Sequence, residues 1–156
     1  MPRSSSSREP ITTVDLGRRG EEIAAAYLQQ IGYRLVAANF SLPVGRNRNH
    51  AVINAEIDLL AYEVDVLCFI EVKTRASDWF AAPSANVDLR KQRQLTRAAR
   101  AYRRMFALTE ADYRYDVVSI VLPTGNEDLE VEIELLRNFW RDEKFQKHRR
   151  REKYWD

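Results

Sequence analysis

The chain has 156 residues, 45% of them hydrophobic and 31% charged, a composition typical of a single soluble domain with a buried core. No apolar run approaches the ~18 residues that a membrane-spanning helix needs, so we expect no membrane contact. The one cysteine cannot form an internal disulfide, which favours a reducing, cytoplasmic location. Two histidines and one cysteine disfavour a zinc site, so a metal would take oxygen ligands.

The net charge of +2 hides an uneven distribution of charge along the chain. Residues 90–104 hold seven basic and no acidic side chains, and residues 137–153 hold eight basic and three acidic ones. Such segments favour contact with a polyanion such as nucleic acid. The alternative is that these side chains only solvate a helix face. Binding through phosphates would depend on salt and discriminate weakly between sequences.

The predicted elements form one α/β domain over residues 14–136, between a flexible tail (1–13) and a basic C-terminal helix and tail (137–156). In chain order we expect a helix from Asp15 or Gly17 to Ile31, strands over 33–40, 52–61 and 66–73, a helix over 88–106, and strands over 115–122 and 129–136. Residues 41–54 are predicted to form an extended hairpin loop, and 77–88 an irregular one. The last strand alternates Val, Ile and Leu with Glu, which is typical of an edge strand.

The helix over 88–106 is predicted to have two distinct faces. Asp88 or a neighbour is the expected N-cap. The residues expected to be buried are Leu95, Ala98, Ala99, Tyr102, Met105 and Phe106. The basic stripe on another face consists of Arg90, Arg93, Arg97, Arg100 and Arg104.

Three polar residues on neighbouring strands are candidates for a hydrolytic site. Glu71 and Lys73 alternate with apolar residues and so share one face of their strand. If that strand pairs with the preceding one, Asp58 can come near Glu71. Two carboxylates make a hard oxygen site suited to Mg²⁺ or Mn²⁺. A lysine beside it could orient or deprotonate a water, or neutralise phosphate charge, as phosphodiester hydrolysis requires.

Simpler interpretations of the same residues stay open at this point. Glu71 and Lys73 could be outward-facing strand residues that form an ion pair. Glu21 lies about 90° from the apolar stripe of the first helix, so it could lean toward the sheet as a third carboxylate. It could equally be a carboxylate favoured by the helix dipole. Trp79 and Phe80 could stack on an unpaired base or pack on the core.

An ordered set of motifs over roughly residues 15–122 resembles the YraN-like family of predicted bacterial nucleases. In chain order these motifs are Gly17-Arg18-Arg19-Gly20-Glu21, Ala26-Tyr27-Leu28, Gly32-Tyr33, Asn39-Phe40, Glu56-Ile57-Asp58-Leu59, Phe69-Ile70-Glu71-Val72-Lys73-Thr74-Arg75, then Pro83, Val87, Lys91, Ala98-Ala99 and Tyr102, and finally Tyr115-Asp116-Val117-Val118. The family is similar to archaeal Holliday junction resolvases. The resemblance implies a restriction-endonuclease-like core, an α-β-β-β-α-β mixed sheet flanked by helices, here with an extra edge strand and the basic C-terminal helix.

The resemblance also implies roles for individual residues. Asp58 and Glu71 would be metal ligands, Lys73 the catalytic lysine, and Glu21 a helical glutamate that acts on the Mg²⁺ or Mn²⁺ directly or through water. The residues expected to contact nucleic acid, from the resemblance or from the basic helix, are Arg18, Thr74, Arg75, Arg90, Lys91, Arg93 and Arg97.

Three departures from the family pattern affect loops rather than these groups. Ala55 stands where a glycine is usual, Ala81 where a Phe-Gly pair is expected, and residues 42–54 form a longer insert.

The expected function is a metal-dependent endonuclease acting on DNA, with branched or junction DNA as the substrate by analogy. A homodimer would suit such a substrate, because junction resolvases cut two symmetric strands. The alternative is a non-catalytic nucleic-acid-binding module of a DNA repair or recombination complex. RNA is a third candidate ligand.

Overall fold

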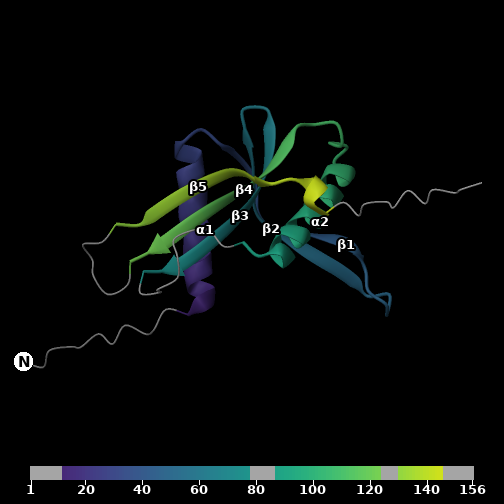
Figure 1. The fold of residues 1–156 in the computed structure, drawn as a ribbon, viewed down its shortest axis with the longest axis horizontal. Helices are drawn as coiled ribbons and strands as arrows, with labels where there is room; N and C mark the ends of the chain where they lie inside the picture. Colours follow the sequence, from purple (N-terminus) through teal and green to yellow (C-terminus); the bar gives the residue numbers. More distant parts are fainter. Residues whose placement is uncertain (1–11, 78–86, 124–129, 146–156) are drawn as a thin grey trace, which may run out of the picture.

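The computed structural model describes residues 12–77, 87–123 and 130–145, which form a mixed α/β fold (Figure 1). Its elements in chain order are α1 (Thr13–Gln30), β1 (Arg34–Arg46), β2 (Val52–Glu63), β3 (Val66–Ala76), α2 (Leu89–Met105), β4 (Tyr113–Leu122), β5 (Glu132–Trp140) and a short 3₁₀ helix (Asp142–Phe145). None of the helices within these ranges is long and apolar enough to span a membrane.

The strands form one sheet in the order β1-β2-β3-β4-β5. Adjacent strands are antiparallel except β3 and β4, which run parallel and are joined through α2. Parallel neighbours require such a crossover connection. The expected edge position of the last strand is therefore confirmed, and β1 forms the other edge.

The two helices cover opposite faces of the sheet. Ala24 and Leu28 of α1 pack with Leu59, Ile70 and other residues of one face. Residues of α2 pack with Ile57, Phe69 and other residues of the opposite face. Alternate residues of β2 and β3 thus supply both cores, which explains why these strands are apolar over most of their length.

Side-chain caps set the start of both helices. The Thr12 hydroxyl accepts the N–H of Asp15 (3.1 Å), so α1 begins at Thr13, two residues before Asp15 and four before Gly17, the two predicted starts. The predicted Asp88 cap is confirmed by its bond from the N–H of Lys91 (2.8 Å).

On α2, the predicted core residues Leu95, Ala98, Ala99 and Tyr102 are buried and the arginine stripe is exposed. Met105 and Phe106, also predicted to be buried, are 53% and 48% exposed. Both lie at the C-terminal end of the helix, which ends at Met105 with Phe106 as its C-cap.

Two sequence predictions about element boundaries are wrong. Residues 41–54 are not mainly a loop, because β1 and β2 continue through them to a tight turn at 47–50. Arg137 does not begin a helix either, since it lies inside β5. Asn138, in the left-handed region (φ 52°), donates its N–H to the buried Asp116 carboxylate (2.9 Å), and this bulged pairing with β4 keeps the chain extended. Three features of the sequence analysis lie outside the described ranges: most of the expected N-terminal tail, the Trp79–Phe80 pair and residues 146–156.

Candidate functional site

β2 and β3 separate where Asp58 and Glu71 are found. Their pairing runs from Glu63↔Val66 to Leu59↔Ile70 and ends there. Beyond that point Asp58 Oδ2 accepts the backbone N–H of Val72 (3.0 Å), taking the place of a backbone carbonyl. The separation leaves a gap in the sheet that is lined by the carboxylates of both strands.

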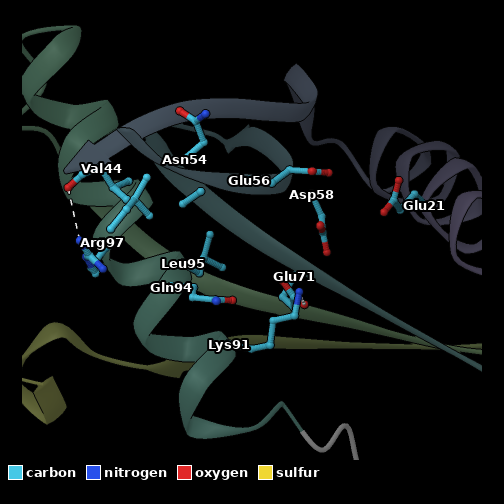
Figure 2. A pocket seen from close by; sticks show the side chains of 12 residues that line it. Glu21, Val44, Asn54, Glu56, Asp58, Glu71, Lys91, Gln94, Leu95 and Arg97 are labelled. Carbon is cyan, nitrogen blue, oxygen red and sulfur yellow. Dashed lines mark hydrogen bonds and ion pairs between the residues drawn. The ribbon is translucent and has the colours of Figure 1, made fainter. Parts of the chain in front are cut away.

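A pocket of about 400 Å³ occupies this region (Figure 2). Its charged lining comes from four elements: Glu21 of α1, Glu56 and Asp58 of β2, Glu71 of β3, and Lys91 and Arg97 of α2. The remaining lining residues are Val44, Ile53, Asn54, Ala55, Gln94 and Leu95. The three carboxylates predicted from the sequence therefore face one cavity.

Glu71 is the most deeply placed of these carboxylates, with 8% of its surface exposed. Its partner is Lys91, whose Nζ lies 3.8 Å from Glu71 Oε1 and reaches toward it in Figure 2. Burial and the neighbouring Asp58 carboxylate raise the pKa of Glu71, while Lys91 and Lys73 act in the opposite direction. The interpretation of Glu71 as an outward-facing strand residue is therefore wrong.

Glu21 reaches the pocket from the opposite helix. Burial and the charge of Asp58 raise the pKa of the Glu21 carboxyl, and a hydrogen bond with the Asn39 side chain lowers it. Asn39 adopts a left-handed conformation (φ 49°) on β1, next to the residues that pair with β2 around Asp58. Asn39 falls near the end of the strand predicted over 33–40 and belongs to the Asn39-Phe40 motif, but the sequence assigned it no role. Its motif and the tolerance of asparagine for positive φ were the signals available.

Gly20 brings α1 close enough to β3 for Glu21 to take this position. A Cβ built on Gly20 would lie 1.8 Å from Thr74 Oγ1, so the helix and the strand touch at a site where no side chain fits. Thr74, predicted to contact nucleic acid, is thus half-buried against the helix.

The other predicted residues divide into two groups. Lys91 and Arg97 line the pocket, and Arg97 Nη2 also donates to the carbonyl of Val44 (3.5 Å). Lys73 is exposed and does not line the pocket, although its charge acts on Glu71. Its place on β3, two residues after Glu71, puts it on the same strand face.

The remaining predicted nucleic-acid contacts lie outside the pocket lining. Arg18 pairs with Glu22 one helical turn away (3.4 Å). Arg75 is half-buried at the end of β3. Arg90 is exposed in the first turn of α2, and the Arg93 guanidinium lies 5.7 Å from the centre of the Phe145 ring.

The carboxylates have the chemistry of a divalent-cation site. The Asp58 carboxylate disfavours ionisation of Glu71, and a cation between the two would relieve that repulsion. Their hard oxygen atoms are the donors that Mg²⁺ and Mn²⁺ prefer. Within the described ranges, no three His, Cys, Asp or Glu side chains are grouped as a ready-made metal centre. The fit to Mg²⁺ or Mn²⁺ therefore rests on the oxygen chemistry of the Asp58 and Glu71 pair.

Comparison with known proteins identifies the family. The model of the uncharacterised protein family UPF0102 matches residues 20–120. A UPF0102 protein of Chlorobium chlorochromatii is 40% identical over 111 residues, which cover 71% of this chain and 78% of the relative. One from Clostridium kluyveri is 35% identical over 113 residues, covering 72% and 84%. The chain belongs to the UPF0102 family, which is the YraN-like family indicated by the sequence motifs.

Proposed function

We propose that this protein is a metal-dependent endonuclease that hydrolyses phosphodiester bonds in DNA on a restriction-endonuclease-like core. The observation that carries the proposal is the convergence of Glu21, Asp58 and Glu71 from three separate elements on one pocket, with Lys91 beside them. Closely spaced carboxyl groups with a perturbed pKa, such as that of Glu71, are typical of functional sites. The order of the elements from α1 to β4 agrees with such a core.

Asp58 and Glu71, with Glu21, would hold Mg²⁺ or Mn²⁺. The bound ion would supply Lewis acidity at the phosphate and lower the pKa of a coordinated water. The chain's own cations would then act on the substrate. Lys91 and Arg97 would hold non-bridging phosphate oxygens at the pocket, and Lys73 would orient the attacking water or cover transition-state charge. Hydrolysis forms one P–O bond from the water and breaks the P–O bond to one sugar oxygen, which leaves with a proton.

Branched or junction DNA is the substrate that we propose within this class, by analogy with the resolvases that the family resembles. Cutting two symmetric strands of a junction would require a homodimer with two such pockets.

The test is cleavage of four labelled DNAs: single strand, duplex, flap and four-way junction. Each is incubated with Mg²⁺, Mn²⁺ or EDTA and with wild type, Asp58→Asn or Lys73→Ala. Glu132→Gln removes one carboxylate from an exposed strand position and serves as the matched control. We expect metal-dependent cutting that falls by about 10²-fold or more in both site variants but not in the control. Absence of cutting of all four DNAs by wild type with either metal would overturn the proposal.

A second candidate function is a non-catalytic nucleic-acid-binding module of a repair or recombination complex. The exposure of Lys73 outside the pocket lining, and the Lys91 ammonium already beside Glu71, favour it. Such a module would bind DNA equally well in EDTA and would cut none of the four substrates. Competition between DNA and RNA of the same sequence would identify RNA as the preferred ligand if RNA displaced DNA more efficiently.

A further inference from the structure

The β1–β2 hairpin continues beyond the rest of the sheet as a two-stranded arm. β1 and β2 pair as far as Arg46↔Val52, whereas the pairing of β2 with β3 stops at Leu59↔Ile70. Among the described strands, none pairs with β2 along residues 41–57, here called the arm, except β1. In Figure 1 the arm runs away from β3, β4 and β5, next to α2. A hairpin alone is marginally stable in water, so other contacts must hold it.

Three contacts fix the arm. Leu42, 2% exposed, packs in the same core cluster as Leu95 of α2. Arg97 Nη2 donates to the carbonyl of Val44 (3.5 Å). At the tip, Asn47 Oδ1 accepts the N–H groups of Asn49 (2.9 Å) and Ala51 (3.0 Å). The arm is thus attached to α2 and ends in an ordered turn.

The charge on the outer part of the arm, away from Glu56 at its base, is of one sign. Between residues 41 and 55 the chain has two arginines, Arg46 and Arg48, and no acidic residue. Both are exposed, and Arg46 Nη1 donates to the carbonyl of His50 (2.7 Å), which keeps its guanidinium at the tip. Arg97 joins this surface to the exposed arginines of α2, because it belongs to their stripe and touches the arm.

The arm also forms one wall of the carboxylate pocket. Val44, Ile53, Asn54 and Ala55 line the same cavity as Asp58 and Glu71. A phosphate backbone that approaches these carboxylates meets repulsion, so it needs nearby cations to hold it. The arm and α2 provide them along one side of the pocket.

We propose that the arm binds the sugar-phosphate backbone of DNA, with Arg46 and Arg48 as its phosphate ligands, and leads the strand along α2 to the carboxylate pocket. This inference rests on the proposed function. It adds a second binding element to the arginine-rich helix and assigns a role to the insert over residues 42–54. The contacts are to phosphates, so binding through the arm discriminates between structures of DNA more than between sequences.

The test is binding of a fluorescein-labelled DNA, single-stranded or duplex, by the full chain in EDTA, measured by anisotropy across a range of salt concentrations. Arg46→Ala/Arg48→Ala is compared with Arg19→Ala/Arg34→Ala, which removes the same charge from exposed positions on α1 and at the opposite end of β1, outside both basic segments. We expect the arm variant to bind at least several-fold more weakly. For two phosphate contacts, the slope of log K against log salt should fall in magnitude by about 1.8 on duplex DNA and about 1.4 on single-stranded DNA. The control should bind like wild type.

A second variant removes the tip without touching the pocket lining. An Asn-Gly pair in place of residues 46–52 joins Gly45 to its pairing partner Ile53 by a two-residue turn. Circular dichroism and the midpoint of thermal unfolding show whether it is folded, and its DNA affinity should match that of the double arginine variant. An unchanged affinity and salt slope in both arm variants, or an equal loss in the control, would overturn the proposal.

These outcomes separate the arm from the nuclease. Binding in EDTA needs no cleavage, so a protein that binds through the arm yet never cuts DNA contradicts only the proposed function. A protein that cuts DNA while both arm variants bind normally contradicts only the inference drawn from the arm. A chain that binds no DNA contradicts both.

Discussion

Val72 donates its backbone N–H to Asp58 Oδ2 at 3.0 Å, across the point where β2 and β3 stop pairing. The carboxylate closes a gap in the backbone hydrogen bonding of β3 and at the same time lines the pocket with Glu71. One side chain thus contributes both to the fold and to the candidate site. These two contributions have opposite effects on stability, because the hydrogen bond stabilises the fold and the like charges destabilise it.

Asp58→Asn and Asp58→Ala should separate those effects. Asparagine keeps an acceptor oxygen for Val72 and removes the charge beside Glu71, so its free energy of unfolding should equal or exceed that of wild type. Alanine leaves the Val72 N–H without its acceptor and should be less stable than asparagine by about 1 to 2 kcal/mol. Urea unfolding at neutral pH without divalent metal measures both. Equal losses in the two variants would show that repulsion from Glu71 contributes little.

Gly20→Ala should destabilise the protein strongly. Its Cβ would meet Thr74 Oγ1 at 1.8 Å and Thr74 Cβ at 2.7 Å, so α1 must move away from β3. We expect a loss of roughly 2 kcal/mol or more in the free energy of unfolding. Gly17→Ala is the matched control on the same helix, because nothing lies within 4 Å of the added Cβ, and it should gain up to about 1 kcal/mol.

The double variant Gly20→Ala/Thr74→Gly tests the cause of that loss. Removing the Thr74 side chain should recover part of the stability, which a double-mutant cycle measures as a coupling between the two positions. Additive losses would contradict a direct clash.

The sequence was sufficient to predict elements whose signals are local. Helical periodicity and the Asp88 cap placed α2 within a residue, and the apolar runs around Asp58 and Glu71 placed β2 and β3. Asp58, Glu71 and Glu21 could be brought together because strand alternation and the angle of Glu21 from the apolar stripe restrict where they point.

The features that were missed depend on contacts distant in sequence. The arm has little burial, so its strands lack the apolar alternation that identifies a strand, and its Pro43 and Gly45 are typical of loops as well as edge strands. The extended chain at Arg137 depends on the bond from Asn138 to Asp116, 22 residues away. The resemblance singled out Lys91 as a nucleic-acid contact, but its ion pair with Glu71 depends on the packing of α2 against the sheet.

Glu63 should make stability depend on pH in the acid range. Hydrogen bonds from Arg137 above all, then from Arg114 and Tyr33, lower the pKa of Glu63 from 4.5 to about 2. A carboxyl whose pKa is lowered by folding stabilises the native state above its unfolded pKa, and this contribution disappears as pH falls from about 4.5 toward 2. Glu63→Gln should therefore lower the free energy of unfolding at pH 7 by about 1 to 2 kcal/mol.

The measurement for Glu63 is urea unfolding of wild type and Glu63→Gln at pH 7 and pH 3. The difference in free energy of unfolding between the two proteins should shrink at pH 3, where wild type has begun to lose the contribution of the Glu63 carboxylate. Glu132→Gln, on the exposed side of β5, should follow wild type at both values. If wild type and Glu63→Gln differ in free energy of unfolding by the same amount at pH 7 and pH 3, the hydrogen bonds from the arginines do not depend on the charge of Glu63.

Lys91→Ala should change metal binding and DNA binding in opposite directions. The Lys91 ammonium lies 3.8 Å from Glu71 Oε1, so it competes with any divalent cation for that carboxylate. Without Lys91, Mn²⁺ should bind roughly threefold more tightly, as measured by isothermal titration in the absence of DNA. The factor is modest because the lysine is largely exposed and its charge is screened. DNA affinity measured in EDTA should fall, because a phosphate ligand is lost.

The control is Lys144→Ala, because the Lys144 side chain donates to Gln92 rather than to Glu71, and it should leave the Mn²⁺ affinity unchanged. Weaker Mn²⁺ binding in Lys91→Ala would instead show that the lysine holds Glu71 in place for the metal.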